Sequence, residues 1–229
     1  HPRVRRQRQM CIRDRYTSLL WEPNEYINIM VYPFTDSQIL GISTFPYSLK
    51  NFFLEGTQQV SASWITLENL SFPYCISINS SYIYEQSTDE RINQNDAAIT
   101  LAHELGHYLG LRHVFSEGGT TSMCTDTDYC KDTPSYNRSE YEQWLNNLDK
   151  QNKYQLKDLA KRYSCEKGEY EAHNIMDYAY CFYNEITLEQ RKRIRHILNY
   201  SPLIPGPKES RIDTRGVQGR LNLPICIMK

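Results

Sequence analysis

The sequence predicts an α+β protein, because strand-like segments dominate its first 85 residues and helical periodicity dominates much of the remaining chain. Three early stretches, at 26–34, 39–45 and 74–84, are rich in Ile, Val and Tyr, residue types that favour strands. Between residues 95 and 110, apolar side chains recur at helical spacing. The chain has 229 residues, of which 40% are hydrophobic. This length suffices for one large domain or a two-lobed one with a substantial core.

The strand segments differ in how clearly they are bounded. Residues 26–34 are predicted to form a buried strand and 39–45 a second one, and a proline at or directly after the end of each favours termination. Residues 60–67 form a weaker strand candidate. Residues 74–84 alternate apolar and polar side chains, which is typical of a strand with one buried face.

Three helical regions are expected. The first has an apolar stripe of Ala98, Leu101, Ala102, Leu105 and Leu109, with Asn95 or Asp96 as its N-cap. Residues 139–163 predict one or two amphipathic helices with a charged, solvated face. Residues 187–200 predict a closing helix capped by Thr187 and stopped by the prolines after it.

The first of these helices carries the pattern HExxHxxGxxH. His103 and His107 are four residues apart, so they project from one face of a helix about one turn from each other. That spacing suits a single tetrahedral Zn²⁺ ion. Gly110 is the residue type that allows the chain to leave the helix at positive φ, so that His113 can return as a third ligand.

Three protein ligands leave a fourth zinc position for water, which is typical of catalytic rather than structural zinc. Glu104, beside the first histidine, would lie next to that position and act as a general base. The alternative, histidines merely packed or solvated on a helix, is disfavoured by five matching positions at fixed spacing.

Seven cysteines are many for a cytosolic enzyme and favour an oxidising compartment. Four of them bracket the region between the motif and residue 181, namely Cys124, Cys130, Cys165 and Cys181. Their spacing matches no zinc-finger pattern, so disulfides are predicted, with three pairings open. No disulfide is predicted for the other three cysteines, Cys11, Cys75 and Cys226.

Charge is unevenly distributed along the chain. Residues 1–15 hold six Arg and one Asp, so the remaining 20 basic and 26 acidic side chains give a net charge of −6. We interpret residues 1–15 as a non-native or disordered stretch outside the fold. Without it, nothing favours nucleic acid as a partner. No apolar run is long enough for a transmembrane helix.

Four segments together resemble the pappalysin family of metzincin metallopeptidases, especially its bacterial secreted members. They are HELGHYLGLRH at 103–113, CKDTP at 130–134, NIMDY at 174–178 and ITLEQR at 186–191. The similarity spans about residues 25–200 and is sharpest around the first and the last two segments.

The resemblance implies a zincin-like architecture: a mixed twisted sheet with backing and active-site helices, then an irregular, disulfide-braced subdomain with a closing helix. The corresponding boundaries are 16–110 for the first subdomain, 111–200 for the second, and 201–229 for a tail. In such enzymes the strand before the zinc helix lies at the sheet edge, so residues 74–84 are expected to offer that edge to an extended peptide, with a purely structural strand as the alternative.

The resemblance also assigns roles in the second half. Met176 is implied as the apolar floor beneath the histidines, and Tyr178 as a hydroxyl donor to the oxyanion. Disulfides are expected to tie the loop to the methionine-turn region. Structural Ca²⁺ is a further expectation, with solvated acids as the alternative, and its candidate ligands are Asp126, Asp128 and Asp132.

The residues after the methionine turn are expected to line a substrate pocket, chiefly Tyr180, Phe182 and Tyr183. A preference for basic side chains and one for bulky or apolar side chains both remain open.

The sequence therefore predicts a monomeric zinc endopeptidase acting on a peptide or protein substrate. It is expected to be secreted, periplasmic or at the cell surface, with a lipid tether upstream of this chain as one option. Two alternatives stay open: a zinc hydrolase of another amide class, and a catalytically silent binding or adhesion module.

Overall fold

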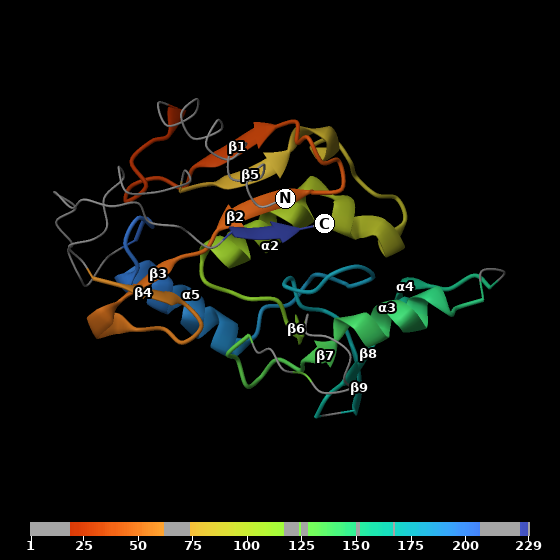
Figure 1. The fold of residues 1–229 in the computed structure, drawn as a ribbon. Coiled ribbons are helices and arrows are strands. Elements are labelled where there is room, and N and C mark those ends of the chain that lie inside the picture. The colour runs from red at the N-terminus through yellow and green to blue at the C-terminus, as the bar shows by residue number, and fades with distance from the viewer. Residues whose placement is uncertain are drawn as a thin grey trace, which may run out of the picture.

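A computed structural model gives the fold, and its mixture of sheets and helices confirms the α+β class (Figure 1). The structure describes residues 19–61, 74–116, 124, 128–149, 152–166 and 168–206, and the backbone of 225–228. In these residues no helix is both long and apolar enough to cross a membrane. The predicted stretch 1–15 lies outside them.

The first sheet contains strands β1 (Ile29–Tyr32), β5 (Ile76–Asn79), β2 (Gly41–Thr44) and β10 (Ile225–Met228), in that order. The β1 and β5 strands are parallel, whereas β2 runs antiparallel to both β5 and β10. This is the mixed sheet that the family resemblance implies. It forms the upper part of the molecule in Figure 1.

Two expectations about these strands are wrong. Strand β5, predicted to offer a free edge to a peptide, is paired on both sides, with β1 and with β2. Alternation along a strand reports which face is buried, but it does not report which strands lie beside it. Strand β1, predicted to be buried, exposes Ile29 and Val31 by 48% and 47%, and these two alternate with the half-buried Met30 and Tyr32, so one face of the strand is exposed.

Helix α2 (Ala97–Tyr108) packs against β2 and β5 and covers the sheet. Asp96 is its N-cap residue, but the Asp96 carboxylate accepts from the backbone N–H of Ser87 rather than from the helix. The 3-10 helices η5 (Ser80–Tyr82) and η6 (Glu90–Asn95) connect β5 to α2. The main core joins α2 and the sheet to the end of the chain, through Tyr47, Tyr74, Ile76, Tyr108, Ile197 and Leu203.

A parallel pair, β3 (Tyr47–Leu49) with β4 (Gln58–Val60), and η2 (Lys50–Phe52) complete the first half. Of the predicted strand at 60–67, residue 60 ends β4, and residues 62–67 lie outside the described part of the chain.

The second half is more regular than predicted, because it contains its own four-stranded sheet. The order is β6 (Phe115–Ser116), β7 (Tyr136–Asn137), β8 (Lys161–Ser164) and β9 (Gly168–Glu171). The helices α3 (Arg138–Asn146) and α4 (Leu156–Leu159) confirm the amphipathic segments, although residue 161 already begins a strand.

The closing helix is confirmed as α5 (Leu188–Tyr200). As predicted, Thr187 caps it. The Thr187 hydroxyl accepts from the backbone N–H of Gln190, and the Gln190 side chain accepts from the backbone N–H of Thr187, which is a complete capping box.

Among the cysteines whose side chains the structure describes, one disulfide forms, between Cys124 and Cys165, and it ties the loop after α2 to the turn between β8 and β9. The prediction that all four cysteines form disulfides is wrong, because the remaining two, Cys130 and Cys181, are buried free thiols. They lie in separate environments. The Cys130 thiol lies 3.7 Å from the carbonyl of Asp128, while the Cys181 thiol lies 3.2 Å from that of Ala172.

Burial should also make these thiols unreactive. It raises the pKa of Cys75 and of Cys130 to about 12, and raises that of Cys181 further. Because the thiolate is the reactive form, we expect iodoacetamide at pH 8 to leave all three unmodified in the folded protein and to label them after unfolding without reductant. Peptide mapping by mass spectrometry checks this. A peptide cross-linked through Cys130 and Cys181 would contradict the structure.

Candidate metal centre

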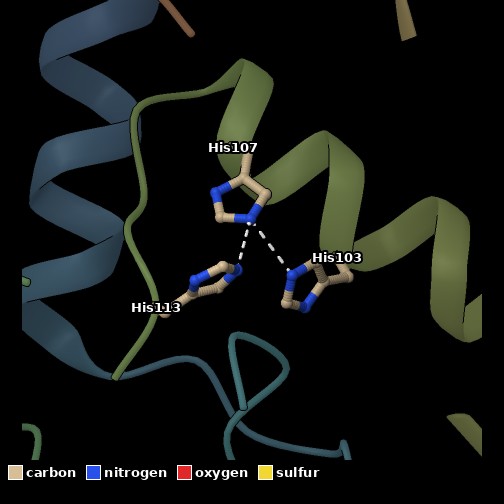
Figure 2. A group of neighbouring side chains, drawn as sticks. All are labelled: His103, His107 and His113. Atoms are coloured by element: carbon tan, nitrogen blue, oxygen red, sulfur yellow. Dashed lines mark hydrogen bonds between the residues drawn. The ribbon is translucent and has the colours of Figure 1, made fainter. Parts of the chain in front are cut away.

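Three histidine side chains converge on one point. The Nε2 atom of His107 lies 3.1 Å from that of His103 and 3.0 Å from that of His113 (Figure 2). His103 and His107 project from α2, and His113 comes from the segment that leaves the helix. In the part of the chain that the structure describes, this is the one group of His, Cys or acidic side chains arranged to hold a metal ion.

The other ring nitrogens fix the protonation of two of these imidazoles. The Nδ1 atom of His103 lies 2.7 Å from the carbonyl oxygen of Ile175, and that of His107 lies 2.8 Å from the carbonyl oxygen of Leu111. Since a carbonyl only accepts, each Nδ1 carries the proton and donates it. The two Nε2 atoms therefore present lone pairs to each other, an arrangement that fits a shared cation between them.

Burial keeps the cluster neutral. It lowers the pKa of His103 to about 4 and those of His107 and His113 well below the usual value, with further lowering of the latter two by neighbouring imidazoles. Neutral imidazole is the form that binds zinc.

The turn after α2 brings His113 back as the sequence predicts. Gly110 has a φ of +87°, which a side chain would strain, and an added Cβ there would lie 2.7 Å from Cγ1 of Ile197. The carbonyl of Gly110 accepts two hydrogen bonds from the buried guanidinium of Arg193, on α5. Sequence reasoning missed Arg193, because its partner lies 83 residues away.

Met176 packs in the core against α2, and its implied role as the floor beneath the histidines stays a prediction. It is fully buried and packs with Leu111 and Val114. Its sulfur lies directly against the position that a Cβ on Gly106 would occupy. The glycine within the HELGH segment therefore permits the close approach of α2 to the methionine turn, a role the sequence did not reveal.

The closing helix holds this turn through its cap. The side-chain amides of Asn174 and Gln190 exchange two hydrogen bonds, of 2.8 and 3.1 Å. The same Asn174 side chain accepts from the backbone N–H of Met176 at 3.0 Å. Gln190 thus serves both the capping box of α5 and the methionine turn, which gives a physical reason for the ITLEQR segment.

Glu104 is fully buried, and its side chain packs against Gly41, the first residue of strand β2. An added Cβ on Gly41 would lie 2.6 Å from Cγ of Glu104 and 2.8 Å from its Oε1. Only glycine at position 41 therefore leaves the space that the Glu104 side chain fills.

We therefore expect Gly41→Ala to displace the Glu104 carboxylate without touching the histidines. Peptide hydrolysis should fall about a hundredfold, since misplacement of a catalytic group by about 1 Å has effects of that order. Zinc content should stay at one per chain. Ser43→Ala, on the same strand, is the matched control and should keep normal rates. Unchanged turnover in Gly41→Ala would show that this contact does not position Glu104.

Tyr178 lies beside the histidines. The centroid of its ring is 4.6 Å from that of His113 and 5.4 Å from that of His103. The guanidinium of Arg138 stacks over the ring at 4.7 Å, a cation–π contact. This placement is compatible with the predicted role as an oxyanion donor, which stays a prediction.

The predicted pocket residues Tyr180, Phe182 and Tyr183 pack in one apolar cluster, but they differ in exposure. Tyr183 is only 5% exposed and packs with Leu156 and Ala172, so it belongs to the core and not to a pocket wall. Phe182 stacks on His173 and faces a groove that also contains Arg91. Tyr180 is half-buried.

The predicted calcium ligands have protein partners. Asp128 accepts from the backbone N–H of Cys130 and the hydroxyl of Thr133. Asp132 accepts from the hydroxyl of Thr187 and the backbone N–H of Glu189, and so supports the start of α5. Asp126 lies outside the described residues. Calcium binding stays a prediction that these contacts do not favour.

Three converging neutral imidazoles define the class of the site, a candidate mononuclear zinc centre of the kind found in hydrolases. Comparison with known proteins identifies the family. The sequence profile of the family described as pregnancy-associated plasma protein-A, Peptidase_M43, matches residues 55–199, more than half of the chain. The chain therefore belongs to this family of metallopeptidases.

Two of the similar curated proteins are both named extracellular metalloprotease. The one from Arthroderma otae is 32% identical over 171 residues, 73% of this chain and 49% of that protein. The one from Arthroderma benhamiae is 37% identical over 108 residues, 46% of this chain and 32% of that protein. The chain thus spans half or less of the length of these relatives.

One solved structure is similar, that of Tannerella forsythia mature mirolysin in complex with a cleaved peptide. It has a TM-score of 0.43 and 20% identity, and the match covers 77% of this chain and 53% of that one.

Proposed function

We propose that this protein is a zinc-dependent endopeptidase. The observation that carries the proposal is the convergence of the Nε2 atoms of His103, His107 and His113. The buried Glu104 lies on the same helix as His103 and is next to it in sequence. Membership of a metallopeptidase family supports it.

In this proposal His103, His107 and His113 hold the ion. Zn²⁺ bound there would lower the pKa of a water molecule and polarise the carbonyl of the scissile bond. Glu104 accepts the proton of the attacking water and then delivers it to the departing amine. The Tyr178 hydroxyl donates a hydrogen bond to the oxygen that becomes negative.

The names of the relatives support a role outside the cell, as does the disulfide between Cys124 and Cys165. We therefore propose secretion. Periplasmic or surface location, a lipid tether and a monomeric state remain predictions.

Two other functions use the same residues differently. A zinc hydrolase of another amide class would keep the metal and Glu104 but reject backbone peptide bonds. A binding module would have no chemical use for a buried glutamate next in sequence to His103, and the presence of Glu104 there favours the enzyme.

The test is incubation of the zinc-loaded chain with a mixed peptide library and, separately, with acetyl-lysine peptides, each with and without 1,10-phenanthroline. We expect internal backbone cleavage that the chelator stops, and the cut sites define the side-chain preference. Release of acetate without backbone cleavage would favour the other hydrolase class. Zinc binding without any product would favour the binding module.

A further inference from the structure

A buried arginine lies under the segment after the methionine turn. Arg162, on β8, has no exposed surface, and its guanidinium stacks on the ring of Tyr141 at 3.7 Å. Burial alone would lower the pKa of Arg162, but the carboxylate of Asp177 and the rings of Tyr136 and Tyr141 outweigh it, so the group stays charged.

The hydrogen bonds of Arg162 go mainly to backbone carbonyls. One terminal nitrogen donates to the carbonyl of Leu159 at 3.0 Å. The other donates to the carbonyls of Tyr178 and Ala179, at 3.2 and 2.9 Å. Its Nε atom lies 3.5 Å from Oδ2 of Asp177, a buried ion pair. A planar guanidinium can reach these acceptors together, whereas a lysine ammonium cannot.

The partner carboxylate completes a clamp on Tyr178. Oδ1 of Asp177 accepts from the backbone N–H of Tyr178 at 2.7 Å and from the hydroxyl of Tyr136 at 2.5 Å. Hence the N–H of Tyr178 is held by Asp177 and its C=O by Arg162. Both peptide groups of the tyrosine beside the histidines are fixed by one ion pair.

The backbone just after Tyr178 is strained. Ala179 and Tyr180 have φ values of +42° and +41°, in the left-handed region that residues with a side chain rarely adopt. Such residues persist only where surrounding contacts determine their conformation. The bonds from Arg162 to the carbonyls of Tyr178 and Ala179 supply those contacts.

From this geometry we infer that the Arg162–Asp177 pair is a positioning device for Tyr178, which sets where its hydroxyl meets the substrate oxygen. The inference rests on the proposed function. A buried ion pair by itself adds little stability, and replacing both partners by apolar residues is often neutral. The Arg162–Asp177 pair holds one residue beside the metal centre, and this role explains its presence better than a contribution to stability does.

The test is a double-mutant cycle on peptide hydrolysis with Arg162→Lys and Tyr178→Phe. We expect Tyr178→Phe to lower kcat about a hundredfold, the effect of removing one oxyanion donor. Arg162→Lys should lower kcat about tenfold, through misplacement of that donor, with KM and zinc content unchanged. Combined with Tyr178→Phe, it should have almost no further effect, because the group it positions is already gone.

Tyr136→Phe is a milder second variant, since it removes only the hydroxyl that donates to Asp177. If Arg162→Lys does not fold, Tyr136→Phe replaces it in the cycle, and its effect on kcat should likewise vanish in the Tyr178→Phe background. Ile204→Val, in the core away from the site, is the matched control for lost stability and should leave kcat unchanged in both backgrounds.

If the effects of Arg162→Lys or Tyr136→Phe multiply with that of Tyr178→Phe, the clamp acts in some other way and the inference fails. A wild type that cleaves no peptide would overturn the proposed function itself, so the two failures are distinguishable.

Discussion

Glu104→Gln is expected to lower kcat for peptide hydrolysis about a thousandfold or more, the upper range for loss of a positioned general base. Glutamine has nearly the same volume, so it fits the space behind Gly41, but its amide cannot take a proton from water. Since His103, His107 and His113 are untouched, zinc should remain at one per chain.

Steady-state kinetics with a quenched fluorogenic peptide, together with metal analysis, measure both quantities. Glu169→Gln is the matched control, because Glu169 is an exposed acid on β9 that pairs only with Lys161 at 3.4 Å among the described contacts. It should behave as wild type. Wild-type turnover in Glu104→Gln would assign the base to another residue and undo the proposed mechanism.

Zinc removal is expected to destabilise the folded protein strongly. Without the ion, the lone pairs on Nε2 of His103 and His107 face each other at 3.1 Å in a buried site. A ligand at about a thousand times its Kd stabilises the native state by about 4 kcal/mol. For a chain of this size that corresponds to a fall in Tm of roughly 10 °C.

Scanning calorimetry with stoichiometric zinc and with EDTA measures this difference. His113→Ala should abolish this zinc-dependent difference in Tm, because the two remaining imidazoles bind the ion too weakly to stabilise the fold. The melting curves with and without zinc should then nearly coincide. His196→Ala serves as the control, since His196 bonds the carbonyl of Phe52 away from the site and its zinc-dependent shift should persist. An unchanged shift in His113→Ala would remove that residue from the ligand set.

The local features of the site could be predicted from sequence because they depend on short spacing. His103 and His107 share a face of α2 for helical reasons alone, and a glycine at 110 is the usual way to leave a helix. The cap of α5 by Thr187 is local in the same sense.

The features that could not be predicted depend on contacts between distant parts of the chain. Gly41 meets Glu104, Gly106 meets Met176, and Arg193 reaches Gly110 only in the folded protein. The position of β5 inside the sheet is likewise a matter of neighbours, which alternation along one strand does not contain.

The cysteines illustrate the same limit. The spacing of the four cysteines predicted disulfides but left three pairings open. In the folded chain Cys124 is bonded to Cys165, while Cys130 and Cys181 are buried as free thiols in separate places. Disulfide formation requires the Cα atoms of the two cysteines to lie within about 7 Å, which no sequence interval specifies.

Titration of the metal-free protein with zinc, with peptide hydrolysis measured at each addition, tests the central claim most directly. If His103, His107 and His113 hold one catalytic ion, activity should rise linearly from zero and stop rising at one zinc per chain. Activity that is already present in the metal-free protein, or that stays absent with one zinc bound, would contradict the account.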